Sequence, residues 1–325
     1  MDRYQRQSML PEIGVQGQQR LARARVLVVG AGGLGATLLP QLAGAGVGFL
    51  RVCDDDRVEI HNLHRQTLFT LEDLGQPKVL ATRRALNALN PDCEVDAVKL
   101  RLSGSSLDAV LHDIDIVVDA ADNFAITWLL SDACFRCELP LISASVLGRQ
   151  GYVGGFCGGA PSYRALFPQL PSSAASCSTA GVMGPAVATL GAVQAQMTLS
   201  VLLGLAPSPL GCLVNCDFVN WRFSQFRFDG APEPMEVVIP FLDVQMLTTE
   251  DCIVELRSPE EAPVSVAAQV HRILPDELAN WQPPSSGRIV LVCASGIRAG
   301  RAAEQLKARG YRDLALVAAE YIPAV

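Results

Sequence analysis

The residues with the clearest chemical potential form a glycine-rich motif near the N-terminus. The motif GAGGLG lies between an apolar run, Arg25–Val29, and a segment with helical character, and Asp54 closes the next apolar run. Glycines let the backbone approach a phosphate, a helix start favours anions, and an acid at this spacing can hold a ribose. The motif predicts a nucleotide site that includes Gly30, Gly32, Gly33, Gly35 and Asp54. An NAD-dependent oxidoreductase would carry the same motif.

Three further polar segments lie near the ends of predicted strands. NLHRQ (62–66) lies just beyond the second strand, GQPK (75–78) opens the helix that follows, and ADN (121–123) follows the strand Asp115–Asp119. Because the carboxyl ends of parallel strands meet at one edge of a sheet, we expect Arg65, Lys78 and Asp122 to lie together there. A triphosphate under attack needs cations around it, and Mg²⁺ needs a carboxylate. The three charges together favour ATP and Mg²⁺ over a dinucleotide, although each of them alone is typical of solvated surface. The predicted nucleotide site is completed by Asp56, Asn62, Gln66 and Asn123.

Two cysteines occupy positions where a thiolate could be stabilised. Cys177 lies in a predicted loop before a long helix, and Cys293 ends a strand that leads through a short loop into another helix. Loop amides and Arg298 would form an anion-binding cradle around a Cys293 thiolate or persulfide. A passive loop thiol at Cys177 and a non-catalytic remnant around Cys293 remain the alternatives.

The elements that must position these residues alternate between strand and helix. This alternation predicts an α/β fold with a Rossmann-like, doubly wound and mostly parallel sheet. After Ala180 a long helix precedes Cys212–Phe228, which reads as two antiparallel strands that continue the sheet around a turn near residues 219–220. The predicted strands are Arg25–Val29, Phe49–Cys53, Glu94–Leu100, Asp115–Asp119 and Leu139–Ala144, and the predicted helices are Ala36–Ala45, Lys78–Leu89, Leu107–Leu111 and Ala125–Cys137.

A proline-rich segment, DGAPEPMEVVIP (229–240), predicts a boundary. We expect one domain over residues 1–232, a linker over 233–248 and a smaller α/β domain over 249–325. Its predicted elements are strands Ile253–Leu256, Ile289–Cys293 and Leu314–Val317 and helices Pro275–Asn280 and Arg298–Arg309.

Composition excludes several classes of function. The formal charge is −7 and the basic residues are scattered, which argues against a nucleic-acid partner. The N-terminus has no apolar signal core, so we expect a cytoplasmic protein with buried thiols rather than disulfides. Gly181–Ala206 is long enough to span a bilayer, but its polar residues and glycines favour a buried helix at a subunit contact over a membrane span.

Several motifs, in this order, resemble the ThiF/MoeB/HesA family, the bacterial relatives of ubiquitin-activating enzymes. They are RYQRQ (3–7), GAGGLG, DDD (54–56), NLHRQ, GQPK, NPD (90–92), ADN and CSTAGVMGP (177–185), and they cover roughly residues 1–230. The stretches LFTLEDLGQPK and CSTAGVMGP look closest to ThiF, the thiamine-pathway member, with the molybdopterin member close behind.

The resemblance implies ATP-dependent adenylation of the C-terminal Gly-Gly carboxylate of a small ubiquitin-like sulfur carrier. It implies that Asp54 holds the ribose, that Asn62, Arg65 and Lys78 contact the phosphates, and that Asp122 holds Mg²⁺. Arg6 would reach the triphosphate bound by a neighbouring subunit, so a homodimer is implied. Cys177 matches the family cysteine that can form a covalent link to the carrier.

The chain departs from the family at its structural zinc site. The family's two CxxC pairs would fall near Ser162–Ala165 and residues 229–234, and no cysteine stands at either place. Four tetrahedral ligands are therefore not available, and we predict no zinc. The loop that zinc would clamp is expected to be held by packing or to be more mobile.

The C-terminal unit resembles a degenerate rhodanese domain through its ELRSPEE (255–261), HRILPDEL (271–278) and IVLVCASGIR (289–298) segments. This implies sulfur transfer through Cys293 from a donor such as a cysteine desulfurase, or a remnant that only supports docking. The competing functions for the whole chain are an NAD-dependent oxidoreductase and a non-catalytic binder of a ubiquitin-like partner. The sequence does not select the carrier or the pathway (thiamine, molybdopterin, siderophore or cysteine synthesis).

Overall fold

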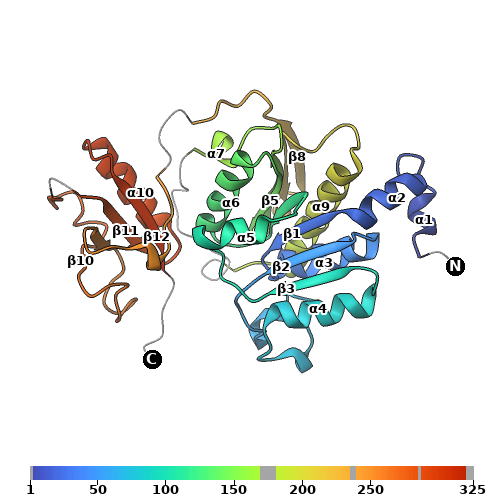
Figure 1. The fold of residues 1–325 in the computed structure, drawn as a ribbon, viewed down its shortest axis with the longest axis horizontal. Coiled ribbons are helices and arrows are strands. Elements are labelled where there is room, and N and C mark those ends of the chain that lie inside the picture. The colour runs from blue at the N-terminus through green and yellow to red at the C-terminus, as the bar shows by residue number, and fades with distance from the viewer. Residues whose placement is uncertain (1–2, 169–180, 235–238, 285–286, 320–325) are drawn as a thin grey trace.

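The computed structural model describes residues 3–168, 181–234, 239–284 and 287–319. A large sheet lies between two layers of helices, and a smaller sheet with one long helix lies at its side, shown in orange and red in Figure 1. The predicted α/β class is confirmed.

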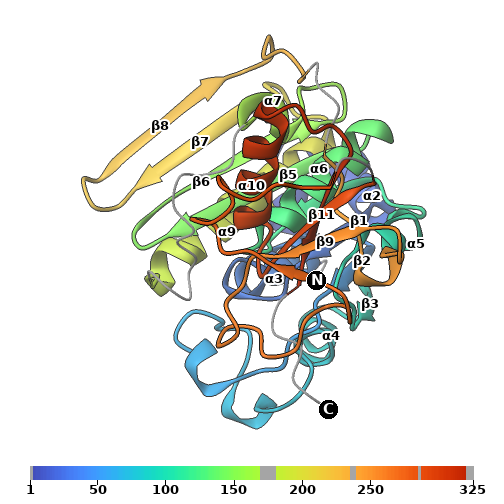
Figure 2. The same cartoon turned by 90° about the vertical axis from the view of Figure 1, so that its left-hand side faces the viewer.

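The large sheet has eight strands in the order β3-β2-β1-β4-β5-β6-β7-β8. The first five are parallel, and β6, β7 and β8 extend the sheet by antiparallel pairing. The pairing of β7 with β8 confirms the antiparallel pair predicted over Cys212–Phe228. Figure 2 shows β7 and β8 as a long hairpin that projects from the body of the protein. The strands are β1 (Arg25–Val29), β2 (Phe49–Cys53), β3 (Glu94–Val98), β4 (Ile116–Asp119), β5 (Pro140–Leu147), β6 (Gln150–Cys157), β7 (Cys212–Asp217) and β8 (Arg222–Arg227).

Helices cover both faces of this sheet. One hydrophobic core joins the sheet to α3 (Gly33–Ala45), α4 (Lys78–Leu89) and α9 (Gly184–Leu203). The other core joins it to α5 (Leu107–Leu111), α6 (Phe124–Arg136) and α7 (Tyr163–Leu166). Side chains that alternate along β1 enter the two cores in turn, because successive residues of a strand point to opposite faces. Two N-terminal helices, α1 (Gln5–Ser8) and α2 (Gly14–Arg23), lie on the side away from the smaller sheet (Figure 1), where α2 is next to the ends of α3 and α9.

The long apolar segment forms the core helix α9. It has the length and hydropathy of a membrane span, yet half of its most apolar window is buried. The buried Gln194 amide donates hydrogen bonds to the backbone carbonyls of Asp119 at 2.6 Å and Ile142 at 3.2 Å. These contacts fix the helix on the sheet, which agrees with the predicted buried helix.

The sequence reading omitted strand β6, and its composition explains why. Gly151, Gly154 and Gly155 interrupt the apolar alternation of this strand. A Cβ atom at Gly151 would lie 2.3 Å from the Ser145 carbonyl oxygen, and one at Gly155 would lie 2.5 Å from that of Pro209. These glycines are required where other backbone approaches the sheet, so tertiary packing replaces the local strand signal.

The smaller sheet is entirely parallel, in the order β10-β9-β11-β12. Its strands are β9 (Cys252–Glu255), β10 (His271–Arg272), β11 (Ile289–Cys293) and β12 (Leu314–Ala318), and α10 (Ile297–Ala308) packs on one face. The predicted helix Pro275–Asn280 is wrong: Glu277 and Asn280 close turns to the residues three before them. Six residues before a proline pair are too few to establish α-helical bonding without support from packing.

Candidate active site

A cavity of about 360 Å³ opens at the carboxyl ends of β1, β2 and β4. It lies where the helices that follow β1 and β4 leave for opposite faces of the sheet, which is where ligands of such sheets bind. All of the predicted nucleotide-binding residues except Gly35 line it. They are Gly30, Gly32, Gly33, Asp54, Asp56, Asn62, Arg65, Gln66, Lys78, Asp122 and Asn123.

The glycine loop is shaped by close backbone approaches. Gly30 has φ +102°, and a Cβ there would lie 2.6 Å from the Ala120 carbonyl oxygen. A Cβ at Gly33 would lie 2.7 Å from Val187 on α9. A Cβ at Gly35 would lie 2.4 Å from the Gly30 carbonyl oxygen, so glycine at this position allows α3 to pack closely on the loop. Gly35 itself does not line the cavity. The N-cap residue of α3 is Gly32, and the described part of the chain gives it no side-chain cap, so the first amides of the helix can bind an anion.

Asp54 is fixed by the backbone around it. Its carboxylate accepts hydrogen bonds from the amides of Ala31 at 2.7 Å and Asp56 at 2.8 Å. Burial raises the pKa of Asp54, and the nearby Lys78 charge and these two amides oppose that rise. The carboxylate is thus held at the mouth of the glycine loop with its orientation set before a ligand arrives.

Lys78 begins α4 and places a cation in the cavity wall. Its side chain is only 6 % exposed, and its Nζ lies 2.7 Å from Asp56 Oδ2, whose own side chain is 66 % exposed. The Lys78 amide also donates to the Asp56 carbonyl at 2.9 Å. Since its partner is largely in solvent, Lys78 can exchange Asp56 for an anion in the cavity.

The segment around Arg65 forms a second wall. Asn62 is buried and accepts from the Glu59 amide at 3.0 Å, which closes a short 3₁₀ turn over Ile60–Asn62. Arg65 Nη1 donates to the His61 carbonyl at 3.2 Å and lies 2.9 Å from His64 Nε2. Gln66 is buried, and its Oε1 has no hydrogen-bond partner within the described part of the chain. A buried acceptor of this kind in a cavity wall fits a ligand that brings a donor.

The loop after β4 carries Asp122 and Asn123. Asp122 is exposed into the cavity, and Asn123 caps α6 by accepting from the Ala125 amide at 2.9 Å. The only group of three or more potential metal ligands found within the described ranges is elsewhere, at Asp54–Asp56 on the opposite side of the glycine loop.

Asp119, which the sequence did not predict as a functional residue, lies at the end of β4 and holds this loop by hydrogen bonds. Its carboxylate is fully buried and accepts from Thr127 Oγ1 at 2.7 Å, Ser143 Oγ at 2.8 Å and the Ala121 amide at 3.1 Å. Burial raises its pKa to about 6, although these three donors oppose the rise. The available signal was an acid at the end of an otherwise apolar strand, IVVD.

Arg6 and Cys177 are the remaining residues that the sequence predicts for this site. Arg6 is exposed on α1 and does not line the cavity of its own chain. Cys177 lies outside the described residues.

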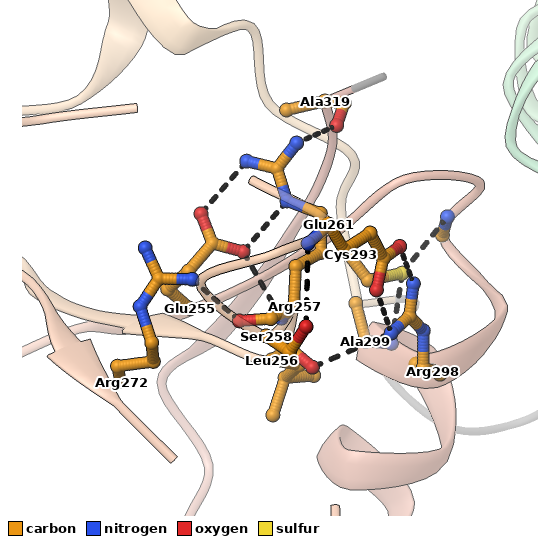
Figure 3. Close-up of polar contacts among 11 residues, drawn as sticks. Glu255, Leu256, Arg257, Ser258, Glu261, Arg272, Cys293, Arg298, Ala299 and Ala319 are labelled. Atoms are coloured by element: carbon orange, nitrogen blue, oxygen red, sulfur yellow. Dashed lines mark hydrogen bonds and ion pairs between the residues drawn. The ribbon is translucent and has the colours of Figure 1, made fainter. Parts of the chain in front are cut away.

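The structure places Cys293 at the end of β11 with its sulfur enclosed. The side chain is fully buried, and Sγ accepts from the amides of Gly296 at 3.2 Å and Ala299 at 3.3 Å. Both Arg298 terminal nitrogens donate to Glu261 instead of turning to the sulfur, as Figure 3 shows. The loop therefore offers amides to a thiolate, while the charge of Arg298 is balanced by a carboxylate.

Hydrogen bonds join the two segments where the family's zinc ligands would fall. Ser162 caps α7, and both its amide and its hydroxyl donate to Glu233 at 2.6 Å. Arg164 adds a two-pronged ion pair with Asp132, at 2.6 and 2.8 Å. A carboxylate thus links the two segments where the family's CxxC pairs would fall.

Comparisons with known proteins agree with this geometry. Residues 4–236 match the ThiF family. The chain is 43 % identical over 240 residues to a sulfur carrier protein adenylyltransferase of Thermus thermophilus, which covers 71 % of this chain and 89 % of that protein. It is 37 % identical over 235 residues to the SAMP-activating enzyme E1 of Haloferax volcanii, with 72 % and 87 % covered.

A longer match extends into the smaller unit. The chain is 45 % identical over 273 residues to the adenylyltransferase and sulfurtransferase MOCS3 of Culex quinquefasciatus. This match spans 80 % of the present chain and 62 % of that relative. Among solved structures, E. coli MccB shares the fold with a TM-score of 0.64 at 21 % identity, covering 73 % and 74 % of the two chains.

Proposed function

Since the chain belongs to the ThiF family, we propose that it is an ATP-dependent adenylyltransferase that activates the C-terminal carboxylate of a small ubiquitin-like sulfur carrier. The observation that carries this proposal is the presence of Arg65, Lys78 and Asp122 in the same cavity as the glycine loop. An oxidoreductase would need few cations beside its pyrophosphate, whereas a triphosphate under attack needs several. The names of the two relatives that this chain covers by more than two thirds support the same substrate class.

The cavity wall fits ATP by its distribution of polarity. Apolar side chains from Val29, Leu100, Leu102 and Ile126 line one part and suit a base. Asp54 is the acceptor for a ribose, and the glycine-loop amides with Arg65 and Lys78 suit phosphates. Gln66 Oε1 supplies an acceptor for a donor on the nucleotide. Asp122 would hold Mg²⁺, which would neutralise phosphate charge when bound.

The reaction asks these residues for position and charge rather than for proton transfer. The carrier's terminal carboxylate is ionised at neutral pH, so it needs no general base. Lys78 and Arg65 stabilise the charge that develops as pyrophosphate leaves, and the fixed loop around Asp122 keeps its carboxylate in place. The hydrogen bonds of Asp119 to Ala121 and Thr127 make that loop rigid before substrates bind.

A groove over the antiparallel part of the large sheet suits the carrier's extended tail. It is lined by residues of β5, β6 and β7, including Ser145, Leu147 and Tyr152. Val146, between Ser145 and Leu147, points to the other face of β5 and lines the nucleotide cavity. The adjoining hairpin exposes Trp221 by 77 % and Phe223 by 58 %, an apolar surface suited to a protein contact.

The smaller unit adds sulfur handling to this proposal. We assign residues 249–325 as a rhodanese-like domain in which Cys293 can carry a persulfide received from a sulfur donor. Arg6 would complete the site of a neighbouring subunit in a homodimer, and Cys177 would form the covalent link to the activated carrier. A cytoplasmic location suits this chemistry.

The test is ATP–pyrophosphate exchange with Mg²⁺ and purified Gly-Gly-ended sulfur carriers. We expect exchange that depends on the carrier and is lost in Asp122→Ala. A carrier truncated by its last two residues is the matched substrate control and should give no exchange. Absence of exchange with every carrier, together with binding of NADH, would establish the oxidoreductase alternative instead.

A further inference from the structure

A second cavity, of about 420 Å³, lies between the large and small sheets. One side is formed by the loop Leu100–Ser106 and the start of α6, and the other by Phe241–Gln245 and the end of β12. This cavity shares wall residues with the nucleotide cavity, so the two are neighbours across one layer of side chains. The shared residues are Leu100, Arg101, Leu102, Asn123 and Ile126.

Asp243 joins the two units across this cavity. Its carboxylate accepts from the amides of Gly104 at 3.2 Å and Ser105 at 3.1 Å, and from the Ser105 hydroxyl. The residue before it is bound to the small sheet, since the Leu242 amide donates to the Leu316 carbonyl at 2.7 Å. Asp243 therefore ties the loop that walls the nucleotide cavity to the edge of the sheet that carries Cys293.

The contact between the two units also encloses the loop that follows Cys293. A Cβ at Gly296 would lie 2.7 Å from Phe241 Cε1 and 3.1 Å from Ala125 Cβ on α6. The Phe241 ring in turn meets Trp128 of α6 edge-on, with ring centroids 6.5 Å apart. The loop drawn in Figure 3 is thus pressed against the large unit, and Cys293 is fully buried. In this arrangement its sulfur cannot meet a sulfur donor or an acceptor from solution.

We propose that the hydrogen bonds of Asp243 to Gly104 and Ser105, here called the latch, hold the two units together in a docked state in which Cys293 is inaccessible. Nucleotide bound in the cavity at the ends of β1, β2 and β4 strengthens this latch. A base packed on Leu100, Leu102 and Ile126 orders the loop whose next residues donate to Asp243. When nucleotide binding has already ordered the loop, forming the Asp243 hydrogen bonds costs less conformational entropy. Nucleotide binding and docking of the two units therefore favour each other. The sulfur-handling thiol is then withheld while ATP is loaded. The latch itself is independent of the proposed function, but its coupling to nucleotide rests on it.

The experiment measures the rate at which N-ethylmaleimide modifies Cys293 in the full chain, with the labelled peptide quantified by mass spectrometry. We expect Asp243→Ala to raise this rate about tenfold, since charge-assisted hydrogen bonds hold the docked state. Ser105→Ala, which removes only the hydroxyl donor, should raise it less. Asp276→Ala is the matched control, because Asp276 is an exposed acid of the same unit away from the contact. It should label as the wild type does.

Saturating MgATP without carrier should slow labelling severalfold in the wild type and have little effect in Asp243→Ala. Equal rates in the wild type and Asp243→Ala would overturn the latch. If calorimetry shows that ATP binds, but MgATP leaves the labelling rate of the wild type unchanged or raises it, the coupling alone would be overturned. Absence of ATP binding would overturn the proposed function together with the coupling, and the latch would be judged by Asp243→Ala.

Discussion

Replacement of Lys78 by methionine separates the proposed catalytic charge from its structural role. Methionine keeps the length and apolar stem of the side chain, which is 6 % exposed, and removes only the cation. Two unit charges about 4 Å apart attract by about 4 kcal/mol at an effective dielectric of 20. Because Asp56 competes for Lys78, only part of this attraction stabilises the transition state. We therefore expect Lys78→Met to lose about 2–4 kcal/mol of transition-state stabilisation, which is roughly a 30- to 1000-fold lower rate of carrier-dependent exchange.

The free energy of unfolding should change little in the same variant. The partner Asp56 is 66 % exposed, and ion pairs with one member in solvent are worth about 0–1 kcal/mol. Arg83→Met is the control, since it removes an exposed cation from the same helix outside the cavity. Exchange in Lys78→Met within threefold of the wild type, or an equal loss in Arg83→Met, would refute the role of Lys78 as a phosphate ligand.

Three further predictions concern buried polar groups. The pKa of Asp119 is raised to about 6, above the unfolded value of about 3.9. The wild type should therefore lose on the order of 3 kcal/mol of stability relative to Asp119→Asn as pH rises from about 4 to 7. Urea unfolding of both proteins across that range checks this, and a constant difference would contradict it. Glu233→Ala should destabilise by about 1–3 kcal/mol, because it leaves the buried amide of Ser162 without its acceptor. Glu233→Gln, which keeps one acceptor oxygen, should recover part of the loss in the same urea titration. Arg257→Met should cost about 3–5 kcal/mol by leaving Glu255 charged and buried, and the double change of both residues to methionine should restore much of it. A double variant less stable than the single one would show that the pair is not the cause.

The sequence was sufficient wherever the signal is local. The glycine loop, Asp54 and the start of α4 at Lys78 were predicted because strand ends, special backbone angles and helix starts are encoded by neighbouring residues. Their common location followed from a general property of parallel sheets. The segment Pro275–Asn280 failed for the converse reason, since its weak helical pattern had no packing face to sustain it.

Tertiary structure decided the features that depend on partners far along the chain. Gln66 has an ordinary position in its motif, and only burial in the cavity wall leaves its Oε1 without a donor among the residues that the structure describes. Arg298 was expected beside Cys293, but Glu261, 37 residues away, takes its hydrogen bonds. Asp243 falls in a segment read as linker, and its bonds to Ser105 cross 138 residues. Contacts of this range leave no periodicity in the sequence, because they depend on how completed layers pack. The sequence alone therefore determined which groups meet at the nucleotide cavity, and the packing of the two units decided that Cys293 is enclosed.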